Sequence, residues 1–349
     1  MKISFIIGFV FLTISQFIFA QSGAVVLDFN HHQNNLLLGK LTQSATSVHT
    51  GFKPLVVQQL DSLSTDSVLY KASTDKLLPR SWYKSWFWRK LRYEDFATAT
   101  TEKYNIRVNP LLRYEIGTEK VLNEKLLINT RGVKVDGSIG SKFAFSTSFY
   151  ENQATYPQYI DTFAYQFGVI PGQGSPKLFG AQGHDFSRAE GYISFAPYKW
   201  LSLQLGQGRN FIGEGYRSMI LSDNTFPYPY LRFNLGSGKW QLQALYTEFT
   251  DFLDKSKEGR VWHYSYHYKR HASMTYLSYK PTTKLELGLF EGIMWLTTDT
   301  AKSIYNKIPP SFFSPIPLLR TLNYGLQEDQ NVLLGLQGKY SPFRNLNIY

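Results

Sequence analysis

Apolar and polar residues alternate along most of the chain beyond its first hundred residues. The stretch KWLSLQLGQGR is the clearest case, because Leu201, Leu203 and Leu205 fall on one face with polar residues between them. Such a period of two is typical of β-strands that have one apolar and one polar face. The alternating runs are each about ten residues long, the length that a tilted membrane-spanning strand requires.

The connections between these runs are of two kinds. Short turns are predicted at 236–238 and 280–283, whereas the sections 151–189 and 297–330 are rich in glycine and proline and are predicted as long extracellular loops. Aromatic residues recur at strand ends, as the interfacial girdles of a membrane barrel require. The predicted fold class is all-β, a transmembrane antiparallel β-barrel of the outer-membrane type over residues 101–349. A soluble β-sandwich also alternates and is the alternative.

Residues 21–100 follow a different pattern and are predicted as an N-terminal periplasmic or interfacial segment with a small helical element. Aromatic residues recur there at helical spacing among basic ones, which is typical of an amphipathic helix in a membrane interface. A helix that packs on the rest of the domain would show the same spacing. The residues predicted to contact the interface are Trp82, Trp86, Trp88, Arg89 and Lys90.

The two ends of the chain carry further signals. Residues 1–20 contain Lys2, an apolar run and a final alanine, which predicts a secretory signal peptide; a membrane anchor is the alternative. At the other end, GLQGKYSPFRNLNIY gives one strand, a turn and only the start of another strand. Because a closed barrel leaves no unpaired edge, we expect the barrel to be incomplete and to lack a C-terminal part.

Composition supports export into an envelope rather than a cytoplasmic role. Aromatic residues make up 16% of the chain, yet the mean hydropathy is slightly negative, as alternation between lipid-facing and lumen-facing positions produces. The formal net charge of +11, of which the signal peptide carries one, favours anionic neighbours such as lipopolysaccharide and acidic polysaccharide, and export makes nucleic acid the least expected partner. The absence of cysteine excludes disulfides and thiolate metal sites.

Several stretches appear in the same order as in a known family, among them NFIGEGYRSMILSDNTFPYPYLRF and YKRHASMTYLSYKPTTKLELGLFE. Over roughly residues 75–349 the chain resembles the Wzi-like capsule-assembly outer-membrane proteins, closest to the Bacteroidetes branch that includes the RemB-type gliding-motility proteins. The resemblance implies an outer-membrane β-barrel of a Gram-negative bacterium that acts as a surface lectin. It would hold capsular or other surface polysaccharide without catalysis. A gliding-motility or secretion-associated role with protein partners is the first alternative, and a porin-like channel is the second.

The glycine-rich stretch 206–233 contains the predicted binding residues. It is not a dinucleotide-binding loop, because Phe211 stands where the third glycine would be, and it lacks the Gly-Lys-Ser/Thr of a phosphate-binding loop. Arginines offer planar forks for carboxylates or phosphates, and tyrosines offer flat faces for sugar rings. The residues predicted to bind polysaccharide are Arg209, Arg217, Asp223, Asn224, Tyr228 and Tyr230. The alternative is that they plug and rigidify the barrel.

No motif in the sequence predicts an enzyme, a metal site or a cofactor. A glycosidase needs two carboxylates at a suitable separation, and the sequence brings together no two of its loop acids, among them Glu151, Glu190 and Glu214. The histidines His263, His267 and His271 recur every four residues, but on the predicted strand such neighbours lie about 13 Å apart. They are therefore predicted as lumen-facing polar residues.

Overall fold

The computed structural model describes residues 24–27, 48–56, 85–92, 94–120, 123–180, 183–251, 268–296, 298–299, 304–305, 310–324, 330–343 and 346–349. The predicted signal peptide and Trp82 lie outside these residues, as do His263 and His267. The side chain of Trp88 is also outside the described part of the chain.

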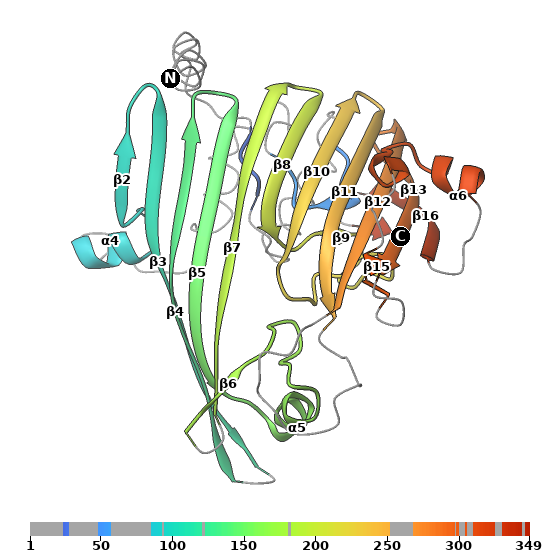
Figure 1. The fold of residues 1–349 in the computed structure, drawn as a ribbon. Coiled ribbons are helices and arrows are strands. Elements are labelled where there is room, and N and C mark those ends of the chain that lie inside the picture. Colours follow the sequence, from blue (N-terminus) through green and yellow to red (C-terminus); the bar gives the residue numbers. More distant parts are fainter. Residues whose placement is uncertain are drawn as a thin grey trace, which may run out of the picture.

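One large antiparallel sheet dominates the molecule (Figure 1). It has 13 strands, with β17-β16-β13-β12-β11-β10-β8-β7-β5-β4-β3-β2 as the order and β6 added beside β7. Its strands are β2 (Ala97–Thr100), β3 (Tyr104–Glu119), β4 (Glu124–Ile139), β5 (Phe143–Thr155), β6 (Lys177–Phe179), β7 (Gly183–Tyr198), β8 (Leu201–Gly208), β10 (Tyr228–Ser237), β11 (Trp240–Asp251), β12 (Tyr268–Thr282), β13 (Leu285–Leu296), β16 (Gln330–Phe343) and β17 (Leu346–Ile348). Within the described residues the sheet stays open, with β2 and β17 at its two edges. The predicted all-β antiparallel class is confirmed.

Short helices and hairpins accompany the sheet. They are α4 (Trp86–Arg92), α5 (Gln158–Phe167), η3 (Pro310–Phe313), α6 (Leu319–Tyr324) and the two-residue strands β14 (Thr298–Asp299) and β15 (Ile304–Tyr305). None of the helices in the described ranges has the length and apolar character needed to cross a bilayer. The helical element predicted before the sheet is present as α4.

The two ends of the sheet differ in how the strands are connected. At one end, which we call the short-turn end, two or three residues join β2 to β3, β4 to β5, β7 to β8, β10 to β11, and β12 to β13. At the other end, the long-connection end, α5 lies between β5 and β7, the short strand β9 (Phe211–Ile212) lies between β8 and β10, and α6 lies between β13 and β16, whereas four residues join β3 to β4. The predicted loop 151–189 was wrong at both bounds, because β5 continues to Thr155 and β7 begins at Gly183.

The strand register gives the sheet two chemically different faces. Successive strands place leucines opposite one another, so that one row crosses six strands on one face, which we call the outer face. The row consists of Leu201, Leu235, Leu242, Leu277, Leu289 and Leu336. The opposite, inner face carries polar side chains such as Gln204, Gln243 and Ser278, all of them buried.

A second, two-stranded sheet fills part of the inner face. β1 (Phe52–Lys53) pairs with β9, and both strands lie against the curved large sheet (Figure 1). Phe52 and Ile212 are fully buried with Tyr276 and Phe290 of the large sheet. We call this inner layer, residues 48–56 and 209–227, the plug. The glycine-rich stretch after β8 thus turns onto the inner face of the large sheet.

Arg232 of β10 ties the plug to the large sheet. Its guanidinium is fully buried, with Nη1 donating to Pro54 O at 2.8 Å and Nη2 donating to Gln243 Oε1 at 2.6 Å. The same group lies 4.2 Å from the ring centroid of Phe52. A carbonyl, an amide and an aromatic face therefore stabilise a cation that burial would otherwise penalise.

On the outer face, the segment 310–324 covers part of β11–β13. Phe312 is buried there against the aromatic side chains of the sheet. Glu291, which is fully buried, accepts hydrogen bonds from Leu318 N at 2.9 Å and from Thr321 Oγ1 at 2.6 Å. We call this segment the strap, because these contacts hold it against the outer face of the large sheet.

The Arg232→Ala substitution should destabilise the protein by about 3 kcal/mol, because it leaves Pro54 O without its donor and opens a cavity beside Phe52. Denaturant unfolding followed by tryptophan fluorescence measures this. Arg217→Ala, at an exposed arginine, is the matched control and should change the free energy of unfolding by less than about 0.5 kcal/mol. Equal effects of the two substitutions would contradict the anchoring role.

Candidate ligand-binding cleft

A cleft of about 440 Å³ opens on the inner face near the long-connection end. Its floor is formed by β3, β4, β5 and β7, and its walls by α5 and the turn 168–174. The lining residues are Leu111, Leu112, Arg113, Ile128, Thr130, Tyr150, Asn152, Tyr156, Ile160, Ile170, Pro171, Gln173, Phe186 and Arg188. This volume lies within the range of small-molecule sites.

The register of the long strands brings the polar lining residues side by side. Thr130 of β4 lies opposite Asn152 of β5, and Tyr150 lies opposite Arg188 of β7. Alternation then places these side chains on the inner face. The floor of the cleft is thus set by strand pairing rather than by a flexible loop.

Hydrogen bonds fix several of these polar groups. Thr130 Oγ1 donates to Asn152 Oδ1 at 2.8 Å, and Asn152 Nδ2 donates to Phe186 O at 3.3 Å. The guanidinium of Arg188 lies 4.7 Å from the ring centroid of Tyr150, and its Nη1 donates to Gln173 Oε1 at 3.2 Å. An aromatic ring, an amide and a cation are therefore held in a fixed arrangement.

The wall formed by α5 is held by packing and by one polar contact. Ala164 and Ile170 are buried against Phe186, and Asp161 Oδ1 lies 2.6 Å from His184 Nε2. Burial raises the pKa of the Tyr156 phenol, which therefore stays protonated at neutral pH. Its hydroxyl remains a hydrogen-bond donor beside the cleft.

The predicted stretch 206–233 supports the cleft from behind and does not line it. A side chain on Gly172 would come within 2.8 Å of Asn224 Oδ1, and one on Gly174 within 2.7 Å of the Phe226 ring. The loop that contains Asp223 and Asn224 thus lies against the turn 168–174. That contact explains why glycine stands at both positions of the turn.

The predicted binding residues have different environments. Arg209 lies 3.3 Å from Glu190, which also contacts Arg188 of the cleft. Arg217 is exposed beside Tyr216, 5.5 Å from its ring centroid. Neither arginine lines the cleft.

The prediction that Tyr228 and Tyr230 offer flat faces to a sugar was wrong. Both belong to the buried core cluster, at 3% and 6% exposure. Tyr228 Oη accepts a hydrogen bond from Asn210 N at 3.0 Å, and Tyr230 Oη accepts one from Gln204 Nε2 at 2.7 Å. Residues of the plug pack over both rings. The sequence of residues 228–230 alone does not predict this contact.

Of the predicted interface residues, Trp86 begins α4 and is 60% exposed. Arg89 and Lys90 both contact Glu94, at 3.3 and 3.6 Å, and Lys90 Nζ donates to Asp95 O at 2.8 Å. The charged groups of α4 are thus partly neutralised by the residues that follow it.

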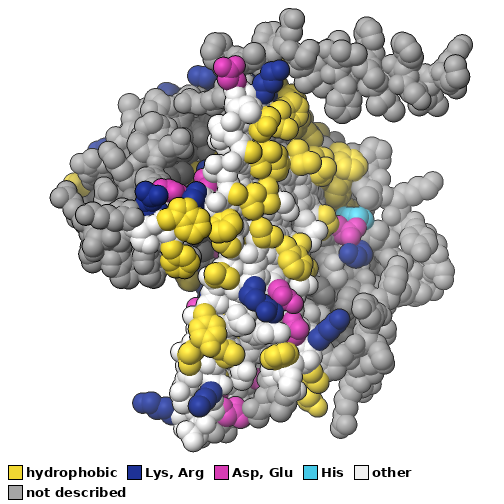
Figure 2. All heavy atoms as spheres, turned by 90° about the vertical axis from the view of Figure 1, so that its left-hand side faces the viewer, with side chains coloured by type: hydrophobic (Ala, Val, Ile, Leu, Met, Phe, Trp, Pro, Cys, Tyr) yellow, Lys and Arg dark blue, Asp and Glu magenta, His cyan; other side chains and the backbone are white. Residues whose placement is uncertain are grey.

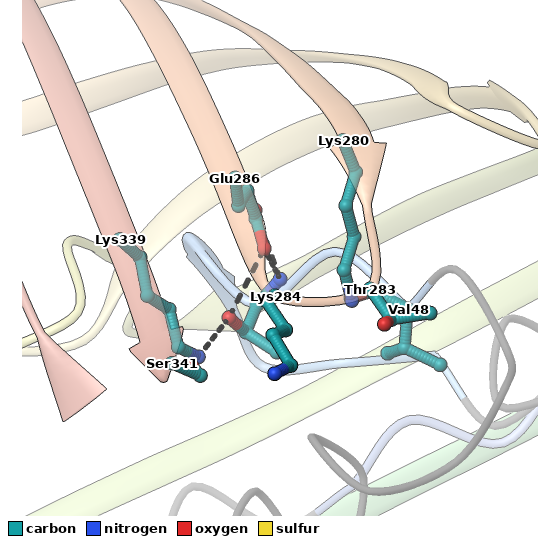
Figure 3. A pocket seen from close by; sticks show the side chains of 8 residues that line it. Val48, Lys280, Thr283, Lys284, Glu286, Lys339 and Ser341 are labelled. Carbon is teal, nitrogen blue, oxygen red and sulfur yellow. Dashed lines mark hydrogen bonds between the residues drawn. The ribbon is translucent and has the colours of Figure 1, made fainter. Parts of the chain in front are cut away.

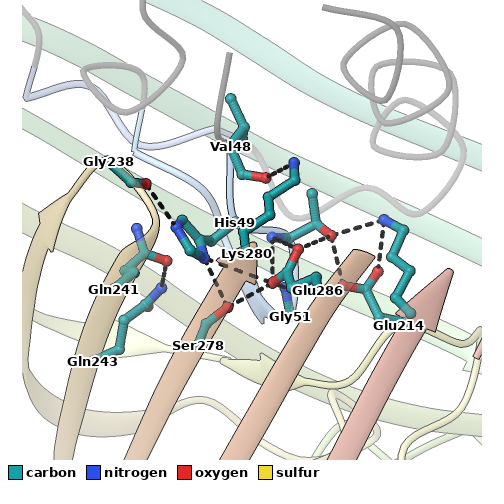
Figure 4. Close-up of polar contacts among 12 residues, drawn as sticks. Val48, His49, Gly51, Glu214, Gly238, Gln241, Gln243, Ser278, Lys280 and Glu286 are labelled. Carbon is teal, nitrogen blue, oxygen red and sulfur yellow. Dashed lines mark hydrogen bonds and ion pairs between the residues drawn. The ribbon is translucent and has the colours of Figure 1, made fainter. Parts of the chain in front are cut away.

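A second cluster of charged groups lies at the base of the plug (Figure 4). Thr50 Oγ1 donates to Glu214 Oε1 at 2.5 Å, and Thr50 N donates to Glu286 at 3.2 Å. Lys339 Nζ lies 2.8 Å from Thr50 Oγ1 and 3.2 Å from Glu214 Oε2. Lys280 Nζ donates to Val48 O at 2.8 Å.

This cluster has no room for a ligand. The cavity beside it, between the side chains of Lys280, Glu286 and Lys339 (Figure 3), has a volume of about 10 Å³. That is enough for roughly one water molecule. Glu214, which sequence analysis left without a second carboxylate, is here brought beside Glu286. The two serve to hold the plug.

Metal-ligating side chains do not gather in groups of three or more within the described ranges. His271 lies on β12, as predicted for a strand, but the prediction that it faces the lumen was wrong. It is paired with Glu248 and Trp295 on the outer face, its ring centroid lies 6.3 Å from that of Phe312 in the strap, and its Nδ1 is 3.8 Å from Glu248 Oε2.

Sequence analysis missed Tyr150, Asn152 and Arg188. It assigned Asn152 and Arg188 to the loop 151–189, although the alternation that defines β5 continues through Asn152. A search for strands longer than about ten residues would have included Tyr150 and Asn152 in one strand, but the residues around Arg188 show no alternation that would have marked the start of β7. No protein-family model, curated protein or solved structure matches the chain.

We expect acid to weaken the plug through His49. Its Nδ1 lies 2.7 Å from Ser278 Oγ and its Nε2 3.3 Å from Gly238 O, and burial lowers its pKa from 6.5 to about 4. Between these values the unfolded chain binds the proton and the folded chain does not. The contribution of His49 to the free energy of unfolding is therefore fully present above about pH 6.5. It is lost as the pH drops toward 4, by at most about 3 kcal/mol. Denaturation midpoints at several pH values, compared with His49→Gln, measure this. An unchanged slope in the variant would contradict it.

Gly174→Ala should distort the cleft wall, because the residue has a φ of 100° and the new methyl group would meet Phe226. Gly180→Ala is the matched control, since Gly180 has a φ of 63° but nothing within 4 Å. The control measures the effect of backbone strain alone, and its free energy of unfolding should fall by about 1 kcal/mol. That of Gly174→Ala should fall by at least about 1 kcal/mol more, because of the clash with Phe226. Thermal unfolding and limited proteolysis compare them. Equal losses would show that Phe226 moves aside at no cost.

Proposed function

We propose that this protein is an outer-membrane β-barrel that binds surface polysaccharide, without catalysis, in the cleft formed by β3, β4, β5, β7 and α5. The observation that carries the proposal is the pairing of a leucine-rich outer face with an inner cleft that holds a tyrosine, an amide and an arginine in fixed positions.

The outer face supports the membrane part of the proposal. Its leucine row is what a lipid-facing wall needs. Toward the short-turn end the row gives way to stacked aromatic pairs, Tyr198 with Trp200 at 5.3 Å and Trp240 with Tyr279 at 4.2 Å between ring centroids. Aromatic rings at this level fit a membrane–water interface. Short turns at this end and long connections at the other match the asymmetry of outer-membrane barrels.

On the outer face, a change from apolar to charged residues supports the proposal that the lipid-facing band ends before the long-connection end of the sheet. Val133 and Phe149 are paired and exposed on the outer face. Two residues farther along each strand, Arg131 and Glu151 form an ion pair at 3.2 Å. Figure 2 shows hydrophobic side chains gathered over the upper part of this face and a mixture of charged and hydrophobic side chains below them. The cleft then lies toward the outside of the cell.

The lining of the cleft supports binding rather than hydrolysis. Hydroxyl, amide and guanidinium groups can hydrogen-bond to sugar hydroxyls, and the Tyr150 ring offers a face for packing. The described lining contains no aspartate or glutamate, whereas a glycosidase uses a pair of them. Several such weak contacts along a polymer would add through multivalency.

The plug favours a binding protein over the porin alternative. It fills the inner face of β10–β13 with buried side chains such as Phe52 and Ile212, which favours binding over free passage of water. The free edges of β2 and β17 need pairing partners in the proposed barrel, because unpaired backbone groups are costly in lipid. The gliding or secretion role stays a prediction.

The double substitution Tyr150→Ala with Asn152→Ala should weaken polysaccharide binding by about tenfold, through loss of one packing face and one amide. The measurement is the division of surface polysaccharide between cells and medium, together with calorimetry on the purified protein. Tyr216→Ala removes an exposed tyrosine outside the cleft and is the control.

Heat-modifiable gel mobility shows whether each variant still folds. Retention equal to the wild type in a folded double variant would exclude the cleft as the site. Unchanged retention after deletion of the gene would exclude the function itself.

A further inference from the structure

We propose that the polysaccharide bound in the cleft is acidic, and that one of its anionic groups binds between Arg188 and Arg209. This inference rests on the proposed function and specifies its substrate class.

One carboxylate oxygen is shared by two guanidinium groups beside the cleft. Glu190 Oε1 lies 3.3 Å from Arg188 Nε and 3.3 Å from Arg209 Nε. Arg188 and Glu190 are inner-face positions of β7, and Arg209 follows β8, the next strand in the sheet. Two positive charges therefore face one negative charge, which leaves a net positive charge at this place.

The contacts within this group are incomplete. At 3.3 Å the charges attract, but neither Nε donates a hydrogen bond with proper geometry, and all three of these buried atoms lack a hydrogen-bond partner among the described residues. Within the described residues, Arg188 Nη2 and both terminal nitrogens of Arg209 also have no partner. Buried polar atoms without partners carry a cost that a ligand with suitable oxygens would remove.

The position of Arg188 connects this group to the cleft. Its guanidinium lies over the Tyr150 ring and donates to Gln173, and both of these residues line the cleft. Arg209 lies outside the lining and reaches the cleft through the shared Glu190. The three side chains are 15% to 22% exposed, so solvent and ligand can reach them.

Guanidinium geometry selects the kind of ligand. The planar fork of arginine matches a carboxylate or phosphate through two parallel hydrogen bonds. A sugar packed near Tyr150 would bring a uronate carboxylate or a phosphate substituent toward the free nitrogens of both arginines. Glu190 occupies part of the same positive field and competes with such a group. Its charge should therefore weaken the binding of an anion and leave a neutral sugar unaffected.

The test uses surface polysaccharide extracted from the producing cells and separated by anion exchange into neutral and acidic fractions. Calorimetry with the full-length protein in detergent should give at least about tenfold tighter binding of the acidic fraction, since hydrogen bonds to charged groups contribute this much. Arg209→Gln should remove about tenfold of that affinity, and Arg209→Lys should restore part of it. Glu190→Gln should strengthen binding of the acidic fraction several-fold. Neither Arg209→Gln nor Glu190→Gln should change binding of the neutral fraction.

Arg217→Gln, at an exposed arginine outside the cleft, is the matched control. Equal binding of both fractions by the wild type would overturn the inference and leave the proposed function standing. Weaker binding of the acidic fraction by Glu190→Gln would also overturn it, because that result would give Glu190 a supporting role. Binding of neither fraction would instead contradict the proposed function.

Discussion

The register of the antiparallel strands is the constraint on which the rest of the molecule depends. Because side chains alternate with a period of two, a slip of one residue in any pair would exchange the two faces of that strand. Here such a slip would move the buried Arg232 to the leucine-bearing face, and Leu231 or Phe233 into the polar interior. Both exchanges are costly, so the two faces specify the register together. The plug and the cleft each require this register, since each is built from inner-face side chains.

The inner face is used in two different ways along the sheet. Against β10–β16 the plug supplies partners for its polar groups: Pro54 O accepts from Arg232, Val48 O accepts from Lys280, and Thr50 N donates to Glu286. Polar residues that would line a water-filled channel are here satisfied by protein. Against β3–β7 the described cover is smaller. Residues 24–27 contact β5 and β7, with Ala24 packed on Ala144 and Val26 N donating to Tyr192 Oη at 3.1 Å, and the cleft forms beside α5 and its turn. The filled half gives the wall its rigidity, and the open half has the room to bind a ligand.

Local pattern in the sequence predicts the sheet but not what covers it. The leucine repeats around β8, β13 and β16 were enough to predict strands, because the outer face of each is almost uniformly apolar. The start of β7 was missed because Asp185, Ser187 and Glu190 place polar residues on both faces, so no alternation marks it. The burial of Tyr228 depends on plug residues that include the distant 48–56, and a single strand carries no sign of that contact. Glu190 was noted in sequence as a loop acid, but its place between two arginines depends on the pairing of β7 with β8.

The exception in the leucine pattern of β13 shows how a local irregularity can mark a tertiary contact. Along its outer face the strand carries Leu285, Leu287 and Leu289, and then Glu291 interrupts the series before Ile293. A lone glutamate buried on this apolar face would be costly without hydrogen-bond partners. The strap removes that cost, because Leu318 N and Thr321 Oγ1 donate to the carboxylate and Arg320 lies 3.6 Å away. Thr275, directly opposite Glu291 on β12, is fully buried as well. On β12 and β13 the polar interruption of the outer face therefore coincides with the strap.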